Sequence, residues 1–229
     1  MRLAVLALTM LTLGACEYAG AFDGGLSRNL KWFSYVGAKD IREACGPGAA
    51  DRLRFVYNGI YIEHIRTYDI HMRPGGKRAL ITVCTRSEPN LARSLNLSEI
   101  RKEWDGEKAQ STLSIQGISE LRTALATDRF TTDRPRRLQL PSNEFYWTGA
   151  ACIDGRFHTN AWLCPTERYD ALKFPAVLMH YDRTEAPLYK ARPVGERDDN
   201  PDLNVGNPLC EIFYVQLGPD GFVSTDGLF

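Results

Sequence analysis

The stretch from Arg52 to Met72 constrains the fold more than any other part of this sequence. It reads RLRFVYNGIYIEHIRTYDIHM, and its β-branched and aromatic residues recur with a period of two, which favours strands. Asn58-Gly59 within it predicts either a tight turn or a bulge inside a longer strand. The RPGGK segment at 73–77 is typical of a turn, and RALITVCT after it predicts another strand. We therefore expect an antiparallel meander of two or three strands.

A second strand signal lies in FYWTGAACIDGRFHTNAWLC, residues 145–164. Asp154-Gly155 at its centre is typical of a two-residue hairpin turn. Such a turn fixes the register, and residues that lie opposite each other in a hairpin point to the same face. The register predicts three pairs on one face of the hairpin: Trp147 with Trp162, Gly149 with Asn160, and Ala151 with His158.

The remaining sequence predicts short helices between these strands. One helix is expected within residues 37–48, and residues 87–128 are expected to be helical in parts, with one apolar helical face. A further short helix is expected in residues 166–183, broken near Pro175. Because strands and helices are segregated rather than alternating, we predict an α+β fold, with an antiparallel sheet of hairpins and meanders and short helices packed on it. The apolar helical face expected within residues 87–128 comprises Ile118, Leu121, Ala124 and Leu125.

The amino terminus carries a different kind of signal. MRLAVLALTMLTLGAC has a single charged residue, Arg2, followed by an apolar run from Leu3 to Leu13. At about 1.5 Å per residue, a helix of that length covers only about half of a hydrocarbon core of roughly 30 Å. A basic start, a short apolar run and a small-residue exit are typical of a secretory signal peptide.

The exit Leu13-Gly14-Ala15-Cys16 resembles the lipobox of bacterial lipoproteins, whose pattern is Leu, then Ala, Ser, Thr or Gly, then Gly or Ala, then Cys. The resemblance, which covers residues 1–16, implies that the Cys16 thiol receives a diacylglycerol, that cleavage occurs just before it, and that the new amino terminus is acylated. An ordinary signal peptide with a chance cysteine is the alternative. Glu17, where retention in the inner membrane would call for Asp, points to the outer membrane facing the periplasm.

These features predict a division of the chain into three parts. Residues 1–15 are the lipoprotein signal peptide, residues 16–28 a lipidated flexible tether rich in Gly and Ala, and residues 29–229 a single α+β domain. Residues 29–229 resemble bacterial lipoproteins to which no activity is assigned, and they do not resemble a named family. We expect the chain to be attached to the membrane through the lipid on Cys16.

Charge and motif content exclude several classes of function. The net charge is 0 at pH 7, so no global field indicates nucleic acid as a partner. The sequence has no C-x-x-C or H-E-x-x-H motif, and we expect neither a metal nor a cofactor. Nucleophile elbows and phosphate-binding loops are also missing from it. The segment 134–137, RPRR, is most simply a solvated loop, with anion binding as the alternative.

The cysteines beyond Cys16 predict a small number of disulfides. An oxidising compartment permits disulfides, and because the number of these cysteines is odd, at least one is expected to remain free within a monomer. We expect a bridge between Cys45 and Cys84, because the first helix must pack on the first sheet. A bridge between Cys152 and Cys164 is not expected from the hairpin register. These cysteines are Cys45, Cys84, Cys152, Cys164 and Cys210.

Two groups of residues are candidates for ligand binding. His64 and Arg66 lie at even positions of the expected strand 60–72, so they share one face and offer polar groups to an anionic or polar ligand. The alternative is a strand that leaves the core, or a bulge. In the hairpin, Trp147 and Trp162 beside His158 and Asn160 would suit a sugar ring, and peptidoglycan is the abundant sugar polymer of the envelope. The alternative is that both indoles are core.

The sequence therefore predicts a lipid-anchored cell-envelope lipoprotein that acts by binding or structure. An envelope hydrolase acting on cell-wall material, with His64 or His158 as acid and base, is the first alternative. The second is an accessory subunit of an envelope protein assembly, with the irregular segment 184–208 as its docking surface. No catalytic motif decides whether the chain is an enzyme.

Overall fold

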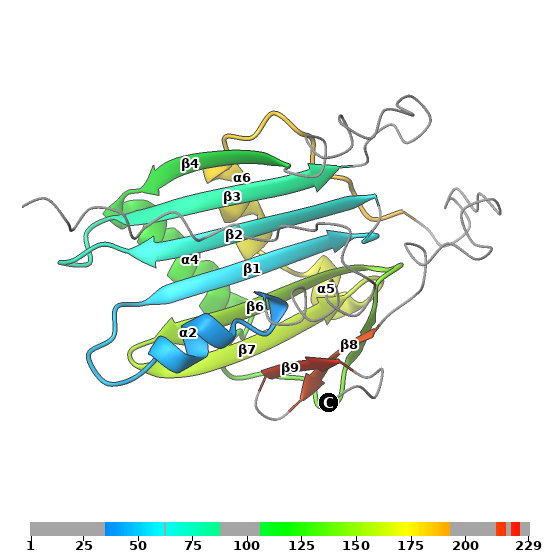
Figure 1. Ribbon diagram of the computed structural model, residues 1–229, viewed down its shortest axis with the longest axis horizontal. Coiled ribbons are helices and arrows are strands. Elements are labelled where there is room, and N and C mark those ends of the chain that lie inside the picture. Colours follow the sequence, from blue (N-terminus) through cyan, green and yellow to red (C-terminus); the bar gives the residue numbers. More distant parts are fainter. Residues whose placement is uncertain (1–34, 62, 88–105, 193–213, 219–220, 225–229) are drawn as a thin grey trace, which may run out of the picture.

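The centre of the fold is a six-stranded antiparallel sheet with the strand order β4-β3-β2-β1-β6-β7. The computed structural model describes residues 35–61, 63–87, 106–192, 214–218 and 221–224. Helices lie on both sides of the sheet, with α2 in front and α4 and α6 behind (Figure 1). The predicted α+β class with a mainly antiparallel sheet is confirmed.

The elements follow one another along the chain in a simple order. The six-stranded sheet contains β1 (Arg52–Gly59), β2 (His64–Met72), β3 (Ala79–Ser87), β4 (Glu107–Leu113), β6 (Phe145–Ile153) and β7 (Arg156–Leu163). A three-stranded sheet contains β5 (Gln139–Pro141), β8 (Tyr214–Gly218) and β9 (Gly221–Ser224). The helices are α2 (Lys39–Ala44), α4 (Ile115–Thr127), α5 (Glu167–Asp170) and α6 (Phe174–Tyr181).

The expected meander is present and has four strands. Its additional strand is β4, which pairs with β3 at the edge of the sheet. Residues 87–128 were expected to be helical in parts. This expectation is correct for α4, but it is wrong for β4 and for Ser87, which is the last residue of β3. Side chains in β4 alternate between half-buried and exposed. Because both faces of EKAQSTL are largely polar, the sequence carries no hydrophobic alternation there to indicate a strand.

Asn58 and Gly59 are the last two paired residues of β1, so this dipeptide forms neither the predicted tight turn nor a bulge inside a longer strand. Ile60 follows with a φ of 67°, and residues 60–63 lead into β2 at His64. The expected continuous strand 60–72 is therefore wrong at its start. From His64 onward the alternation of faces is as predicted, because β2 is regular to Met72.

The face of the sheet toward α4 and α6 holds the larger apolar cluster, which includes Phe55, Tyr68, Trp147, Trp162 and Phe174. The apolar face predicted for α4 is confirmed, since Ile118, Leu121, Ala124 and Leu125 are all buried. The side chain of Ser114 caps α4 by accepting from the backbone N–H of Gly117 at 3.2 Å. The predicted short helix in residues 166–183 is two helices, and Pro175 lies in the first turn of α6, where its missing N–H costs nothing.

The opposite face carries α2 and the three-stranded sheet. Arg54 of β1 is 4% exposed and joins α2 to the sheet. Its guanidinium donates to both carboxylate oxygens of Asp40, at 3.0 and 3.1 Å, and to Oδ1 of Asp69 at 3.0 Å. Although burial alone would raise the pKa of Asp40, the neighbouring guanidiniums of Arg54 and Arg52 hold that pKa below its ordinary value. Removing one of these three charged side chains, Arg54, Asp40 or Asp69, would leave a buried charge without its partner.

The predicted hairpin register is confirmed in every pair. Trp147 lies opposite Trp162, Gly149 opposite Asn160, and Ala151 opposite His158. The turn residues Asp154 and Gly155 both have positive φ, 50° and 72°, as the tight turn requires. A Cβ on Gly155 would lie 2.6 Å from the carbonyl oxygen of Gly46, so glycine is required there also by the close approach of the loop after α2.

The expected pairing of Cys45 with Cys84 is wrong. Cys45 is bonded to Cys152, with a Cα–Cα distance of 5.5 Å. Cys84 is disulfide-bonded too, with a partner other than these two, and Cys164 is free. The reason is the strand order: α2 packs on β6, whereas β3, which carries Cys84, is separated from β6 by two strands.

The disulfide is expected to be directly observable. Peptide mapping of the unreduced protein should recover a linked pair containing Cys45 and Cys152, while Cys164 should react with an alkylating agent. Replacing Cys45 and Cys152 together by serine should lower the free energy of unfolding by about 2–5 kcal/mol, because the bond closes a long loop. A linked pair containing Cys45 and Cys84 would contradict this assignment.

Trp147→Ala is expected to destabilise the protein by about 3–5 kcal/mol, because its indole is 3% exposed within the larger apolar cluster. Urea denaturation followed by circular dichroism measures the change. Ile115→Ala is the matched control, since that side chain is 64% exposed and its loss should cost less than about 0.5 kcal/mol. Similar losses from both variants would show that the indole is not a core residue.

Candidate functional site

The sequence-predicted pair His64 and Arg66 lies in a buried polar network. Arg66 is 3% exposed. Its Nη1 pairs with Oδ2 of Asp182 at 2.8 Å, and its Nη2 donates to the carbonyl oxygen of Ala186. The hydroxyl of Tyr68 also donates to Oδ2 of Asp182, at 3.0 Å. These contacts come from one face of β2 and end on the segment that follows α6.

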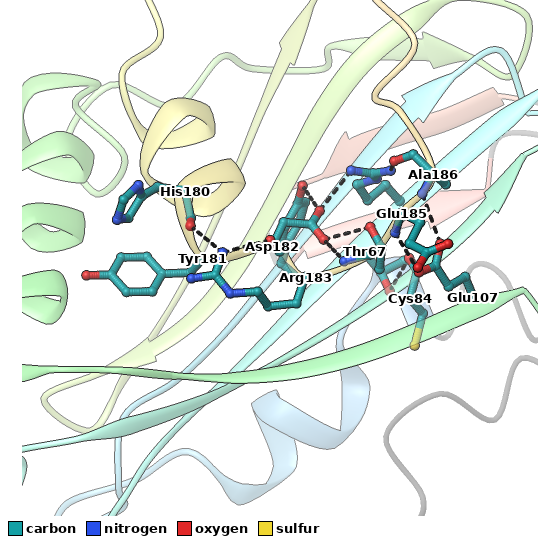
Figure 2. Close-up of polar contacts among 12 residues, drawn as sticks. Thr67, Cys84, Glu107, His180, Tyr181, Asp182, Arg183, Glu185 and Ala186 are labelled. Carbon is teal, nitrogen blue, oxygen red and sulfur yellow. Dashed lines mark hydrogen bonds and ion pairs between the residues drawn. The ribbon is translucent and has the colours of Figure 1, made fainter.

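Residues 182–191, which we call the strap, cross the sheet near β1 to β4. Figure 2 shows the carboxylate of Glu107 on β4 accepting the backbone N–H groups of Glu185 and Ala186, at 2.6 and 3.0 Å. At the other end of the strap, Tyr57 donates to the carbonyl oxygen of Tyr189 at 2.5 Å. The strap has no regular hydrogen bonding of its own, so these side chains satisfy its backbone groups.

His64 is packed under this strap. Its ring stacks on Tyr189 with centroids 4.7 Å apart and an interplanar angle of 14°, and its exposed fraction is 0%. Burial, together with the nearby charge of Arg66, lowers the pKa of His64 to about 4, although Asp182 acts in the opposite direction. His64 is therefore neutral at pH 7. The pair His64 and Arg66 fastens the strap and offers no open ligand pocket.

The hairpin indoles are core residues, as the alternative interpretation held. Trp147 and Trp162 are 3% and 1% exposed, and both rings pack against Phe174 of α6, at centroid distances of 5.3 and 5.0 Å. Trp147 also lines an open hollow together with Tyr169. An open two-indole platform for a sugar ring does not exist in this structure.

Asn160 has a structural role too. It is 0% exposed, and its amide donates to the carbonyl oxygens of Phe130 and Asp133, both at 2.9 Å. Its oxygen accepts from the backbone N–H of Ala161 at 2.8 Å. A satisfied buried amide of this kind rigidifies what it bonds. Asn160 therefore fixes the loop after α4 against β7.

His158, another sequence-predicted ligand-binding residue, borders a different open hollow. The hollow has a volume of about 350 Å³ and lies at the edge of β7. Because Phe157 and His158 are consecutive in a strand, their side chains point to opposite faces, so the hollow spans the sheet edge. We call it the edge hollow. Its lining comprises Arg42, Phe130, Thr131, Arg134, Phe157, His158 and Thr159.

Three elements bring the edge hollow together. The last turn of α2 contributes Arg42, whose Cζ lies 5.2 Å from the ring centroid of Phe157, a cation–π distance. The loop after α4 contributes Arg134, whose Nη2 donates to the carbonyl oxygen of Gly218 at the end of β8. Gly221 lies against Arg42 with a φ of 132°, and a Cβ there would clash with that guanidinium.

The electrostatics of the edge hollow are one-sided. Its lining holds two guanidinium groups and an imidazole, and no carboxylate. Burial lowers the pKa of His158, and the charge of Arg156 lowers it further. Arginine forks match carboxylates and phosphates in geometry. The arrangement can therefore bind an anion, and it contains no carboxylate pair for acid–base work.

Sequence reasoning found only part of this hollow. It identified His158, and it named anion binding as the alternative for the segment that contains Arg134. It missed Arg42 and Phe157, which come from elements 115 positions apart in the sequence. Nothing local indicates that a short amphipathic helix and an edge strand meet at this point.

Comparison of the chain with models of protein families, with curated proteins and with solved structures gives no match. The described residues contain no group of three or more His, Cys, Asp or Glu side chains that could hold a metal ion. Within the same ranges, no helix is both long and apolar enough to cross a membrane.

Stability is expected to depend on pH through His64. Its pKa falls from an ordinary 6.5 to about 4 on folding, so below pH 6.5 the unfolded chain binds a proton that the folded chain excludes. The free energy of unfolding should therefore decrease as the pH falls from about 6.5 to about 4, with about 1–2 kcal/mol lost by pH 5.

His64→Phe isolates this contribution, because it keeps a ring against Tyr189 and removes the titrating group. Urea denaturation at pH 7.5 and pH 5 should show a smaller loss for the variant than for the original protein. His71 and His158 also have lowered pKa values but are present in both proteins, so they cancel. An equal loss in both proteins would contradict the assignment.

Proposed function

We propose that the protein is a lipid-anchored cell-envelope lipoprotein, held in the outer membrane facing the periplasm, that acts by binding. The observation that carries the proposal is Leu13-Gly14-Ala15-Cys16, placed directly after one basic residue and a short apolar run. Two or more acyl chains at Cys16 would give a stable anchor. Residues 17–229 would then be the part presented to the periplasm.

Two features of the fold support an envelope protein that binds. The Cys45–Cys152 disulfide is typical of proteins that fold in oxidising compartments. The lining of the edge hollow contains two guanidinium groups and an imidazole and no carboxylate, which suits recognition of an anion.

The geometry gives the alternative of a cell-wall hydrolase less support. Glycan hydrolysis ordinarily needs two carboxyl groups at a set separation, and the lining of the edge hollow contains none. Of the two histidines considered as acid and base, His64 is 0% exposed and covered by the strap. His158 alone, in a hollow without a carboxylate to orient it, lacks the partner that a general base requires.

Cys16→Ser is expected to abolish acylation and to release the protein from membranes. Mass spectrometry of the amino-terminal peptide should show a lipid-modified Cys16 in the original protein. Partition into a detergent phase should be lost in the variant, because the anchoring free energy of the acyl chains is gone.

Cys164→Ser is the matched control, because it removes the free thiol without touching the signal. It should leave acylation and detergent partition unchanged. An original protein with an unmodified amino terminus at another residue would overturn the anchor. Density-gradient separation of the two membranes tests the outer-membrane assignment, and recovery with the inner membrane would contradict it.

A further inference from the structure

We propose that the open hollow lined by Trp147 and Tyr169 binds a short peptide that carries an apolar side chain and has both ends free. We call it the aromatic hollow. It lies between the α5–α6 region and the strap, apart from the edge hollow, so this inference goes beyond the role proposed above. It does not require the lipid anchor.

The apolar lining of the aromatic hollow is the first argument. Its floor is formed by Tyr57 and Trp147, which are 1% and 3% exposed. Around them, partly buried apolar side chains that pack against the larger core cluster converge on this one hollow. An apolar side chain of a ligand would be removed from water against them, which favours binding. These side chains are Tyr169, Leu172, Leu188 and Ala191.

The second argument is that the walls are held in place before any ligand arrives. The ring of Trp147 packs on Tyr57 and Phe174, at centroid distances of 4.9 and 5.3 Å. The hydroxyl groups of Tyr57 and Tyr169 lie close enough to interact, and Tyr57 also donates to the carbonyl oxygen of Tyr189 in the strap at 2.5 Å. These contacts join β1, β6, α5 and the strap around one space. A preformed site loses little conformational entropy on binding.

The charged residues of the lining are the third argument. Asp170 is the last residue of α5, and Lys190 belongs to the strap; both are exposed. The hollow therefore presents one carboxylate and one ammonium group from two different elements. A ligand with a single charge would be attracted by one of them and repelled by the other. A peptide with a free ammonium and a free carboxylate group can meet both.

The size and chemistry of the aromatic hollow favour a peptide over an acyl chain or a neutral sugar. Its volume of about 320 Å³ lies at the lower end of the range of small-molecule sites, roughly 300–1,000 Å³. An acyl chain would use the apolar walls and neither charge. A neutral sugar needs several hydrogen-bonding partners for its hydroxyls, and the walls are mostly apolar. A short peptide with an apolar side chain uses both parts of the lining.

Three dipeptide probes test the proposal. The full-length chain, purified in detergent, is titrated with leucyl-phenylalanine, with its N-acetylated and C-amidated form, and with glycyl-glycine, and the same solution without protein is the blank. Ligand-detected nuclear magnetic resonance gives the dissociation constants. We expect leucyl-phenylalanine to bind at least about threefold more tightly than the capped form, because its two end charges are matched. It should bind at least about tenfold more tightly than glycyl-glycine, which has no apolar side chain.

Two exposed variants separate charge recognition from folding. Asp170→Asn and Lys190→Gln should each weaken binding of leucyl-phenylalanine about threefold and leave the capped form unchanged. Glu167→Gln is the matched control, because it removes a charge from an exposed position of the same helix, α5, outside the lining. It should change neither dissociation constant.

Ala191→Phe tests the place of binding, because a larger side chain in the wall should fill the hollow. It should weaken binding of both apolar dipeptides at least about tenfold. If this variant does not fold, Asp170→Asn and Lys190→Gln still decide the proposal, since both replace exposed side chains.

Each outcome decides something. Equal binding of glycyl-glycine, no binding of leucyl-phenylalanine, or unchanged binding by Asp170→Asn and Lys190→Gln would overturn the proposal. Mass spectrometry of Cys16 is independent of these titrations. An acylated chain that ignores the dipeptides contradicts this inference and leaves the anchor standing, whereas an unacylated chain that binds them contradicts the anchor alone.

Discussion

The backbone pairing of β1 with β6 is the interaction on which the rest of the structure depends. It joins a meander from the first half of the chain to a hairpin from the second half, from Arg52 opposite Cys152 to Gly59 opposite Phe145. Because register fixes the face of every side chain, this one pairing places Cys152 under α2. The same pairing buries Trp147 on the other face. The disulfide and the aromatic core both depend on this pairing.

Charged groups in this fold divide into those that hold elements together and those that face outward. Arg54 fastens α2 to the sheet, and Arg66 with Asp182 fastens the strap. Buried pairs of this kind specify arrangement more than they add stability, because desolvation offsets much of their attraction. Arg42 and Arg134 line the edge hollow, where Arg42 lies over the ring of Phe157 and Arg134 donates to the carbonyl oxygen of Gly218.

Local signals predicted those parts of the fold that depend on neighbours in sequence. Asp154-Gly155 fixed the hairpin register, because a two-residue turn leaves no freedom in the pairing. The apolar period of α4 identified its buried face. Two parts escaped prediction: β4, whose polar sequence lacks alternation, and the partner of Cys45, which depends on strand order. Of the candidate site residues, His158 alone borders the hollow, because burial of His64 and Trp147 is decided by the strap and α6, elements distant in sequence.

The sequence by itself determined the α+β class and the hairpin with its facing indoles, since each depends on a contiguous pattern of propensity or turn chemistry. Tertiary structure alone decided that the indoles are core, that Cys45 is bonded to Cys152, and that Arg42 and Arg134 line one hollow. These are contacts between separate elements of the fold, and the disulfide joins positions 107 apart in the sequence. Their free energy comes from burial and charge pairing across the whole fold, which no local pattern records.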